Sequence, residues 1–416
     1  MKTFKSADIL IPKNVDFTKW SVVACDQYTS EPEYWEKAAE IVGDEPSTLN
    51  IIFPEVYLDE GDNRIKKINK TMDEYIDRGI FNEYKDALIY VERNVGKGRI
   101  RKGLVGCIDL EDYDFNKGSG SLVRATEGTV LERIPPRVKI RENAKLELPH
   151  VMILIDDEAK RVIEPLANKK NDFEKLYNFE LMQESGSISG YLINDEAKSD
   201  VYQGIEKLFD EFEEKYKITN SAKLIFAVGD GNHSLATAKT CWENIKKNLN
   251  ENEIENHPAR YALCELVNIH DAALEFEPIH RVVFDIDADK LISQLSEYYD
   301  ISTEDNGGQH FEYVCAKERK TVYINNPSSG LSVGTLQNFL DSYVSLNGGK
   351  IDYIHGDDVT VRLGSKEGNI GFILPAMGKN ELFGAVISDG ALPRKTFSMG
   401  EAFEKRFYLE AKRIVK

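Results

Sequence analysis

The chain has 416 residues, enough for two or three domains with a large core. Hydrophobic residues make up 41% of it and charged residues 30%, as in ordinary globular proteins. The formal net charge of -18 argues against non-specific nucleic-acid binding and against binding to an anionic membrane, although a local basic pocket can still hold a small anionic ligand.

Cysteine usage and the N-terminal residues indicate a compartment. The five cysteines are scattered and form no C-x-x-C pair, which predicts reduced thiols. They are Cys25, Cys107, Cys241, Cys264 and Cys315. The first residues, MKTFKSAD, lack the apolar core of a secretion signal, and no apolar run approaches membrane-spanning length. We therefore expect a cytoplasmic protein.

Hydrophobic periodicity predicts strands mixed with helices along the whole chain. In the first half we expect strands at 21–25, 88–93, 100–110, 151–155 and 161–163, and helices at 30–41, 65–76 and 201–216. Ser30 and Glu33 have the spacing of a capping box, and Gly79 is a candidate C-terminal cap. In the second half we expect strands at 224–228, 261–269, 276–282, 311–324 and 370–374, and helices at 234–245, 288–299 and 335–346. The pattern predicts an α/β (α+β) fold with a boundary between residues 1–284 and 285–416.

One stretch stands out as a binding site. The apolar run Leu224–Val228 ends in Gly229-Asp230-Gly231-Asn232-His233-Ser234, and a helical pattern follows. A strand, a tight polar turn and a helix N-terminus place polar side chains beside free backbone N–H groups, which suits an anionic ligand. Asp230 could ligate a metal or act as a base, and His233 could transfer a proton or contact a phosphate. An ordinary Asp-Gly turn with a capping asparagine would have the same sequence.

A second group of residues could bind phosphoryl or carboxylate oxygens. It follows a Gly/Ser loop and comprises Arg124, Thr126, Glu127, Arg133, Arg137 and Arg141. Arginines bind such oxygens bidentately, and Glu127 could act as a base or bind magnesium. The same spacing also suits a solvated strand face.

Three further groups carry weaker signals. His270-Asp271 and His280-Arg281 could be ligands or acid–base groups, although no zinc-binding spacing accompanies them. Residues 353–358 and 393–396 could complete a site or be turns, and Asp26 with Tyr28 is typical of a helix cap. The chain contains neither the G-x-x-x-x-G-K-[ST] loop nor the G-x-S-x-G motif.

Six landmarks in one order resemble a known family, that of the domain of unknown function 1015. They are Val22–Tyr28, Arg124–Glu127, Gly229–Lys239, Pro278–Arg281, Tyr353–His355 and Pro393–Thr396. The family's central turn usually reads Asp-Gly-His-His-Arg and is similar to the phosphate-binding turn of the ParB/sulfiredoxin-like superfamily, which includes partition proteins, sulfiredoxins and free-serine kinases. The resemblance implies a mixed-sheet ParB/sulfiredoxin-like core with an additional α/β C-terminal region.

By position, the resemblance carries Asp230, Gly231 and His233 over as phosphate-site residues. Asn232 stands where the family has its first histidine, and Ser234 where it has an arginine. Either another cation contacts the phosphate or the ligand differs. The candidate cations are Lys239, Arg281 and the group Arg124–Arg141. His280 joins Arg281 as a candidate substrate-binding residue.

Two functions fit these residues. The first is an enzyme of serine or related metabolism that transfers or hydrolyses a phosphoryl group on a small polar metabolite, with Asp230, His233 and Glu127 in the chemistry. The second is a nucleotide-responsive regulator that binds without turnover. Both imply a phosphorylated metabolite or a nucleotide as partner, with Mg²⁺ or a nucleotide as cofactor, and neither implies nucleic acid or a membrane. Nothing in the sequence selects a metal ligand set or an oligomeric state.

Overall fold

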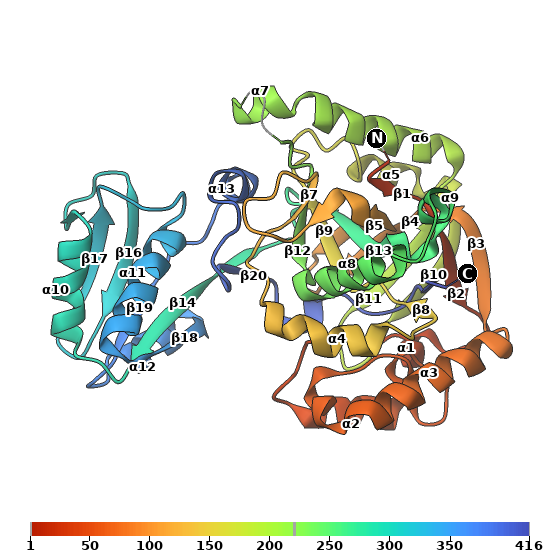
Figure 1. Ribbon diagram of the computed structural model, residues 1–416, viewed down its shortest axis with the longest axis horizontal. Helices are drawn as coiled ribbons and strands as arrows, with labels where there is room; N and C mark the ends of the chain where they lie inside the picture. Colours follow the sequence, from red (N-terminus) through yellow and green to blue (C-terminus); the bar gives the residue numbers. More distant parts are fainter. Residues whose placement is uncertain (1, 219–221, 416) are drawn as a thin grey trace. The chain divides into compact units, whose positions relative to one another are not determined.

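A computed structural model describes residues 2–218 and 222–415 (Figure 1). Its contacts group the chain into two compact units. Unit 1 comprises Met1–Ala125, Thr129–Leu274 and Gly400–Lys416, and unit 2 comprises Thr126–Gly128 and Glu275–Met399. No helix in the described part of the chain is long and apolar enough to cross a membrane.

Unit 1 is built on a ten-stranded mixed sheet. Its strand order is β10 (Glu174–Glu180), β11 (Ser187–Leu192), β4 (Ile89–Asn94), β5 (Ile100–Asp109), β13 (Tyr261–Asn268), β9 (Val151–Ile155), β12 (Phe226–Asp230), β7 (Val123–Ala125) and β6 (Tyr113–Asp114), and β1 (Phe4–Lys5) pairs with β5. All five residues of β9 are buried, as expected of a central strand covered on both faces. Strand β9 runs parallel to β13 and antiparallel to β12.

Helices and two small sheets surround this sheet. The helices are α1 (Phe17–Trp20), α2 (Pro32–Val42), α3 (Gly61–Asp77), α4 (Ile134–Arg141), α5 (Glu164–Lys169), α6 (Asp195–Asp210), α7 (Phe212–Tyr216), α8 (Asn232–Lys246) and α9 (Glu251–Asn256). Strand β2 (Ala7–Pro12) pairs with β3 (Phe81–Ala87), and β21 (Lys412–Arg413) pairs with β8 (Leu146–Glu147). Helix α8 buries Leu235, Ala238 and Trp242, and α4 lies beside it (Figure 1).

The last residues of the chain belong to the core of unit 1. Phe407, Tyr408, Leu409 and Ala411 are all buried. Their backbone bonds the first residues of the chain, because Leu10 and Ala411 exchange both N–H···O bonds. Residues 400–416 therefore complete unit 1 rather than extend unit 2.

Unit 2 contains a seven-stranded sheet and four helices. The strand order is β15 (Ile301–Ser302), β17 (Arg319–Ile324), β16 (Gln309–Val314), β19 (Ile370–Ile373), β14 (Phe276–Phe284) and β18 (Lys350–His355), with β20 (Phe397–Met399) also paired to β14. The helices are α10 (Ala288–Tyr298), α11 (Ser332–Asn347), α12 (Asp357–Gly364) and α13 (Glu381–Asp389). Within the described residues, strand β14 pairs with β18, β19 and β20, all later in the chain, and unit 2 accordingly includes the residues from Glu275 onward.

The α/β class and the mixed sheet are confirmed, and so is the strand–turn–helix arrangement around Asp230. Helix α8 begins at Asn232, two residues before Ser234. The division of the chain into regions 1–284 and 285–416 stays a prediction. In the contact-based grouping, the main part of unit 2 lies between two parts of unit 1 in the sequence.

Four local predictions are wrong. Residues 161–163 form no strand, because the Asp157 carboxylate accepts the N–H groups of Arg161 and Val162. Residues 201–216 form two helices, α6 and α7, with Glu211 between them. Helix α2 begins at Pro32, whose missing N–H is harmless in a first turn, so Ser30 is not its cap. Residues 21–25 form only an isolated bridge, between Val23 and Phe407.

Candidate functional site

The turn after β12 has a conformation that requires glycine. Gly231 has a φ of 79°, in the left-handed region. A Cβ at this position would lie 2.8 Å from Cδ2 of His150 and 3.1 Å from Cα of Val151. The Asp230 carboxylate accepts the Gly231 N–H at 2.9 Å. The turn therefore lies directly against the start of β9, with its carboxylate folded back on its own backbone.

Helix α8 offers free donors at this turn. Its first described backbone bond runs from the Leu235 N–H to the Gly231 carbonyl, at 3.0 Å. Among the described residues, no acceptor bonds the N–H groups of Asn232, His233 or Ser234. The buried Oδ1 of Asn232 also has no hydrogen-bond partner there. Three unsatisfied N–H groups at the positive end of a 15-residue helix form an electrostatic environment that favours an anion.

His233 is neutral at physiological pH. Burial lowers the pKa of its imidazole to about 4, and the positive charges of Arg137 and Arg133 contribute in the same direction. Its Nε2 accepts the Val130 N–H at 3.3 Å, so the proton of the neutral ring is on Nδ1. His233 is thus a hydrogen-bond donor through Nδ1 without a full positive charge.

A partly buried ion pair lies beneath the turn, with His150 buried and Asp26 half-buried. His150 Nε2 lies 3.4 Å from Oδ2 of Asp26, and His150 Nδ1 lies 2.6 Å from the Tyr408 hydroxyl. Burial by itself would lower the pKa of His150, but Tyr408 and Asp26 raise it well above its usual value. Burial by itself would raise the pKa of Asp26, but His150 lowers it well below its usual range. The pair therefore consists of an imidazolium and a carboxylate.

Lys405 approaches the turn from the C-terminal residues. Its Nζ lies 3.3 Å from Oδ2 of Asp230, and its side chain is 12% exposed. Its charge also contributes to the low pKa of Asp26. A lysine distant in the sequence thus lies beside both carboxylates of the site.

The predicted arginines have different surroundings. Arg137 pairs with Glu55 and bonds the Arg133 carbonyl at 2.9 Å, while the Arg133 side chain is exposed near His233. Arg124 is buried, and its Nε and Nη2 donate to the carbonyls of Ser121 and Ala222 at 2.8 and 2.6 Å. Of this group, Arg133 and Arg137 are the ones whose charges act on the turn.

Two more proposed cations are already bonded elsewhere within unit 1. Lys239 donates to the Leu110 carbonyl at 2.8 Å and pairs with Glu243 at 2.7 Å. Arg141 bonds Glu147 at 2.5 Å. Neither side chain forms an ion pair with the turn in the part of the chain that the structure describes.

Thr126, Glu127, His280 and Arg281 belong to unit 2. Arg281 is fully buried and donates to the Lys395 carbonyl at 2.9 Å and to Gln337 Oε1 at 3.1 Å. Burial lowers its pKa to about 10. Glu127 Oε1 accepts the Thr396 N–H at 3.4 Å, and the Thr126 carbonyl accepts the Leu392 N–H at 2.8 Å. These contacts fasten residues 392–396 to β14 and to the 126–128 segment.

His280 lies between two partners in the same unit. Its Nε2 is 2.8 Å from Oδ1 of Asp357, and its Nδ1 accepts the Leu374 N–H at 3.1 Å. The residues at 353–358 and 393–396 also meet, since the Arg281 and Arg394 guanidiniums lie 5.0 and 5.4 Å from the Tyr353 ring. The structure thus brings residues 353–358 and 393–396 together inside unit 2.

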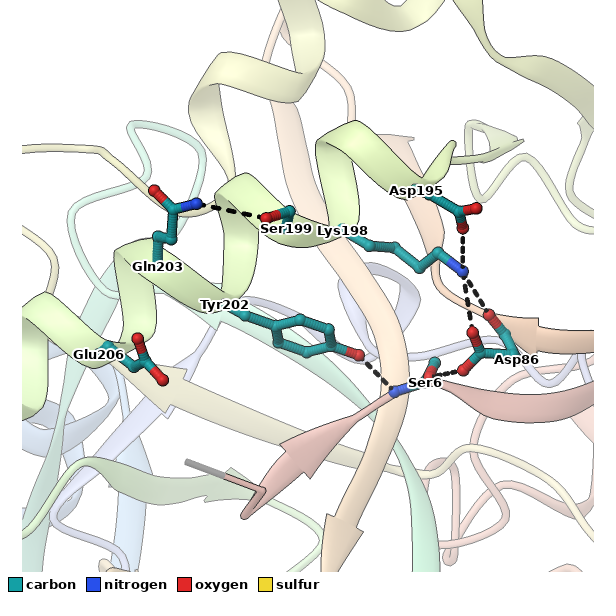
Figure 2. A pocket seen from close by; sticks show the side chains of 8 residues that line it. All are labelled: Ser6, Asp86, Asp195, Lys198, Ser199, Tyr202, Gln203 and Glu206. Carbon is teal, nitrogen blue, oxygen red and sulfur yellow. Dashed lines mark hydrogen bonds and ion pairs between the residues drawn. The ribbon is translucent and has the colours of Figure 1, made fainter.

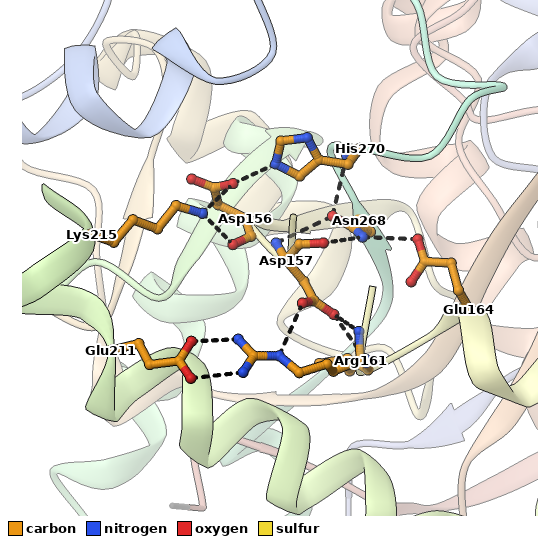
Figure 3. Close-up of polar contacts among 9 residues, drawn as sticks. Asp156, Asp157, Arg161, Glu164, Glu211, Lys215, Asn268 and His270 are labelled. Carbon is orange, nitrogen blue, oxygen red and sulfur yellow. Dashed lines mark hydrogen bonds and ion pairs between the residues drawn. The ribbon is translucent and has the colours of Figure 1, made fainter. Parts of the chain in front are cut away.

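His270 belongs to a network of polar side chains near the ends of β9 and β13 (Figure 3), whereas the Asp271 carboxylate accepts the N–H groups of Lys102 and Ala273 at 3.0 and 2.7 Å. His270 Nε2 lies 2.6 Å from Oδ1 of Asp156, and Lys215 pairs with the same oxygen at 2.7 Å. Asn268 donates to the Asp157 carbonyl and to Glu164, both at 2.8 Å. Because the carboxylate of Asp156 is saturated by its neighbours, we interpret this network as structural.

A hollow of about 440 Å³ lies along α6 (Figure 2). It is lined by Ser6, Asp86, Asp195, Lys198, Ser199, Tyr202, Gln203 and Glu206. Its ammonium, on Lys198, already pairs with Asp195 at 2.7 Å and Asp86 at 3.1 Å. The hollow therefore presents mainly negative charge and does not suit a phosphate.

Comparison with known proteins identifies the family. A model of the family described as "Protein of unknown function (DUF1015)" matches residues 9–343. The chain belongs to this family. No curated protein matches it.

Some solved structures are weakly similar. A free serine kinase in complex with AMP is 9% identical, with 76% of this chain and 93% of that chain covered and a TM-score of 0.39. A conserved hypothetical protein from Pyrococcus furiosus is 11% identical over 77% and 97% of the chains, with a TM-score of 0.37. SbnI from Staphylococcus aureus, with a C-terminal truncation, is 9% identical over 71% and 83%, with a TM-score of 0.36. Similarities of this size support no statement about a shared ligand or reaction.

Three residues of the site had no signal as site residues in the sequence. His150 directly precedes a buried strand, and Tyr408 and Lys405 lie in the C-terminal residues. The family match ends at residue 343, so it covers neither Tyr408 nor Lys405. The run of apolar residues from Phe407 to Leu409 does indicate burial, but only the fold shows what Lys405 contacts.

Proposed function

We propose that unit 1 binds the phosphate group of a small polar metabolite, of the serine or phosphoserine kind, or of a nucleotide, and that it transfers or hydrolyses this group. The observation that carries the proposal is the turn at Asp230–Ser234. There, three backbone N–H groups at a helix N-terminus have no protein acceptor among the described residues. Backbone donors in this arrangement suit phosphate oxygens of any phosphorylated ligand.

His233 and Asp230 have distinct roles in this proposal. The Nδ1–H of neutral His233 donates a hydrogen bond to a phosphate or leaving-group oxygen. Asp230 holds the turn closed and accepts the proton of the attacking hydroxyl or water. Phosphoryl transfer depends mainly on positioning and charge neutralisation, so a site with few reacting groups is sufficient.

Magnesium fits this site only as an ion held mainly by the ligand. In residues 2–218 and 222–415, no group of three or more His, Cys, Asp or Glu side chains is arranged to hold a metal ion. Mg²⁺ commonly binds through one or two carboxylates together with substrate phosphates. Asp230 would supply the carboxylate in unit 1, and the ion would neutralise phosphate charge. Glu127 remains our second proposed carboxylate, on unit 2.

A thermal-shift panel tests the proposal. The ligands are ATP, ADP, AMP, serine and phosphoserine, each with and without Mg²⁺. A ligand at 100 times its dissociation constant should stabilise the folded protein by about 2.7 kcal/mol. Release of phosphate or transfer to serine is then measured with the best ligand. The proposal is wrong if no phosphorylated compound stabilises the protein.

Variants assign the roles. His233→Ala and Asp230→Asn should each lower kcat/KM at least tenfold. His310→Ala removes an exposed histidine of unit 2 and serves as the control. Variants of His233 and Asp230 that are folded and as active as the parent would contradict the roles given to these two residues.

One observation favours a second function, nucleotide-responsive binding without turnover. A histidine whose pKa is about 4 is a weak proton acceptor at neutral pH. In that case the same ligands would stabilise the protein, but no phosphate, phosphoserine or ADP would form above background.

A further inference from the structure

We infer that Lys405 is a ligand-binding residue of the candidate site, delivered to it by the C-terminal segment Gly400–Leu409. The inference rests on the proposed function and names the side chain that contacts the ligand's phosphate group.

The turn needs a cation that it does not itself contain. The sequence from Asp230 to Ser234 has no lysine or arginine, and the first turn of α8 has no charged side chain. A phosphate at the free N–H groups would also lie near the carboxylates of Asp230 and Asp26. Neutralising such charge is the principal task of a phosphoryl site.

Lys405 is the cation that unit 1 places at the turn. Among the described residues, Asp230 forms its ion pair with Lys405. The other nearby cations have partners or positions elsewhere, since Arg137 pairs with Glu55 and Lys239 with Glu243. Arg133 is exposed on a short 3-10 helix.

The N–H donors of the Lys405 ammonium are available to a ligand. Its contact with Asp230 is a single approach of 3.3 Å, and no hydrogen bond of Nζ occurs within the described residues. An ammonium has three N–H donors. A side chain that is only 12% exposed is costly to leave with unused donors, so an oxygen-rich ligand would complete its surroundings.

Both chain neighbours of Lys405 are anchored in the interior of unit 1. Glu404 is 5% exposed and pairs with Arg99, and its carbonyl accepts from Arg101 Nη1 at 2.7 Å. Arg406 is 2% exposed and bonds Glu265 at 2.8 Å as well as Glu410.

Further contacts hold the chain two residues before Lys405 and five residues after it. Arg93 bonds the Phe403 carbonyl at 2.8 Å, and Tyr177 bonds Glu410. Glu265 reaches this cluster over Gly103, where a Cβ would lie 2.2 Å from its Oε1. Buried ion pairs add little net stability, but they restrict the geometry of the groups that they join. This cluster therefore holds the backbone at Lys405 in place without using the lysine itself.

The test compares ligand binding by the parent protein, Lys405→Met, Lys405→Arg and Arg413→Met. Arg413 is exposed in the same C-terminal residues and is the matched control. ADP and inorganic phosphate are the probes, measured by calorimetric titration and by the ligand-dependent shift in melting temperature. Because the melting-temperature shift compares each variant with and without ligand, a purely structural effect of the substitution cancels.

We expect Lys405→Met to bind ADP about 10- to 100-fold more weakly than the parent, as for loss of a charge-assisted hydrogen bond. Lys405→Arg should recover most of the affinity, and Arg413→Met should bind like the parent. Should Lys405→Met fail to fold, Lys405→Gln retains hydrogen-bonding capacity without the charge and gives the same comparison.

Two negative results have different meanings. If the parent binds ADP and Lys405→Met or Lys405→Gln binds it with equal affinity, the inference about Lys405 is wrong and the proposed function stands. If the parent binds only phosphoserine, the same variants are compared with that ligand. If the parent binds neither ADP nor phosphate nor any phosphorylated compound of the thermal-shift panel, the proposed function is wrong and the inference is overturned with it.

Discussion

His150 is the residue on which the interior of the candidate site depends. It lies beneath Gly231, bonds Tyr408 and pairs with Asp26, so it links three segments that are far apart in sequence. A buried imidazolium is stable only while its carboxylate partner remains charged. The side-chain contacts of His150 therefore add to the backbone bonds that join the segment before Asp26 to the C-terminal residues, such as Ala24 N–H to the Arg406 carbonyl at 2.9 Å.

Replacing Asp26 by Asn should lower the free energy of unfolding by about 1–3 kcal/mol near pH 5.5. The raised pKa of His150 contributes stability below about pH 6.5, which is lost as the pH rises through its folded-state pKa. The lowered pKa of Asp26 contributes stability above about pH 4, which is lost at lower pH. The difference between parent and variant should thus be largest between these limits.

Urea unfolding at pH 5.5 and pH 9 measures the effect of Asp26→Asn. Asp44→Asn, at an exposed aspartate, is the control. An equal loss of stability in both variants would show that the pair with His150 contributes nothing particular.

His233 should titrate with a midpoint near pH 4 in the folded protein. Its folded-state pKa lies below the value of about 6.5 in the unfolded chain, so its contribution to stability is present above pH 6.5 and is lost as the pH falls toward 4. In His233→Gln, the fall in stability between pH 6.5 and 4.5 should be smaller by about 1–3 kcal/mol. An NMR titration of the imidazole gives the midpoint directly, and a value between 6 and 7 would contradict the buried, uncharged ring described above.

At the scale of elements, β12, Gly231 and α8 act as one strand–turn–helix element. Burial of Phe226, Ala227 and Val228 fixes the strand in the middle of the sheet. The buried face of α8 fixes the helix, and the turn between them is held against β9. The free N–H groups of the helix thus have a fixed direction before any ligand arrives, which lowers the entropic cost of binding.

Gly231→Ala should lower the free energy of unfolding by about 1–3 kcal/mol. A residue with a Cβ is strained at this left-handed φ, and the added Cβ would also clash with the His150 ring. Gly118→Ala is the matched control. The φ of Gly118, 78°, is close to that of Gly231, but no atom lies within 4 Å of the added Cβ. The control should lose less stability. Thermal and urea unfolding of the two variants give the comparison, and equal losses would mean that the turn can move away from β9.

At the scale of the whole molecule, the chain leaves unit 1 after Leu274 and returns to it at Gly400. The sheet pairings of β14 to β20 all lie within unit 2, so that unit has its own hydrogen-bonded framework. Unit 1, in contrast, depends on residues 400–416 for buried side chains such as Tyr408 and Leu409.

We predict that residues 275–399 fold alone, whereas residues 1–284 without 400–416 do not. The three tryptophans, Trp20, Trp35 and Trp242, are all buried in unit 1, so their fluorescence reports on that unit by itself. In the short 1–284 chain the tryptophan emission should resemble that of the unfolded protein, while circular dichroism of 275–399 should show a cooperative transition. A native-like tryptophan transition in residues 1–284 would show that the C-terminal residues are dispensable.

Most of the local elements and the position of the turn could be predicted from the sequence. Alternating and helical patterns of apolar residues predict most of the strands and helices, and Gly-Asp-Gly-Asn-His after an apolar run predicts the strand–turn–helix element, because these signals depend on neighbours in the chain. The strand predicted at 161–163 is absent because the Asp157 carboxylate, and not the backbone of a neighbouring strand, accepts the N–H groups of Arg161 and Val162.

Which charged side chains lie together follows from the folded arrangement of the chain. It placed Asp26, His150 and Lys405 around the turn at Asp230, and it placed Glu127, His280 and Arg281 in unit 2. The partners of a side chain far along the chain depend on strand order and on the path of the last residues through the core. No local pattern records that path, so a lysine near the C-terminus could be recognised as part of the site only after the chain was folded.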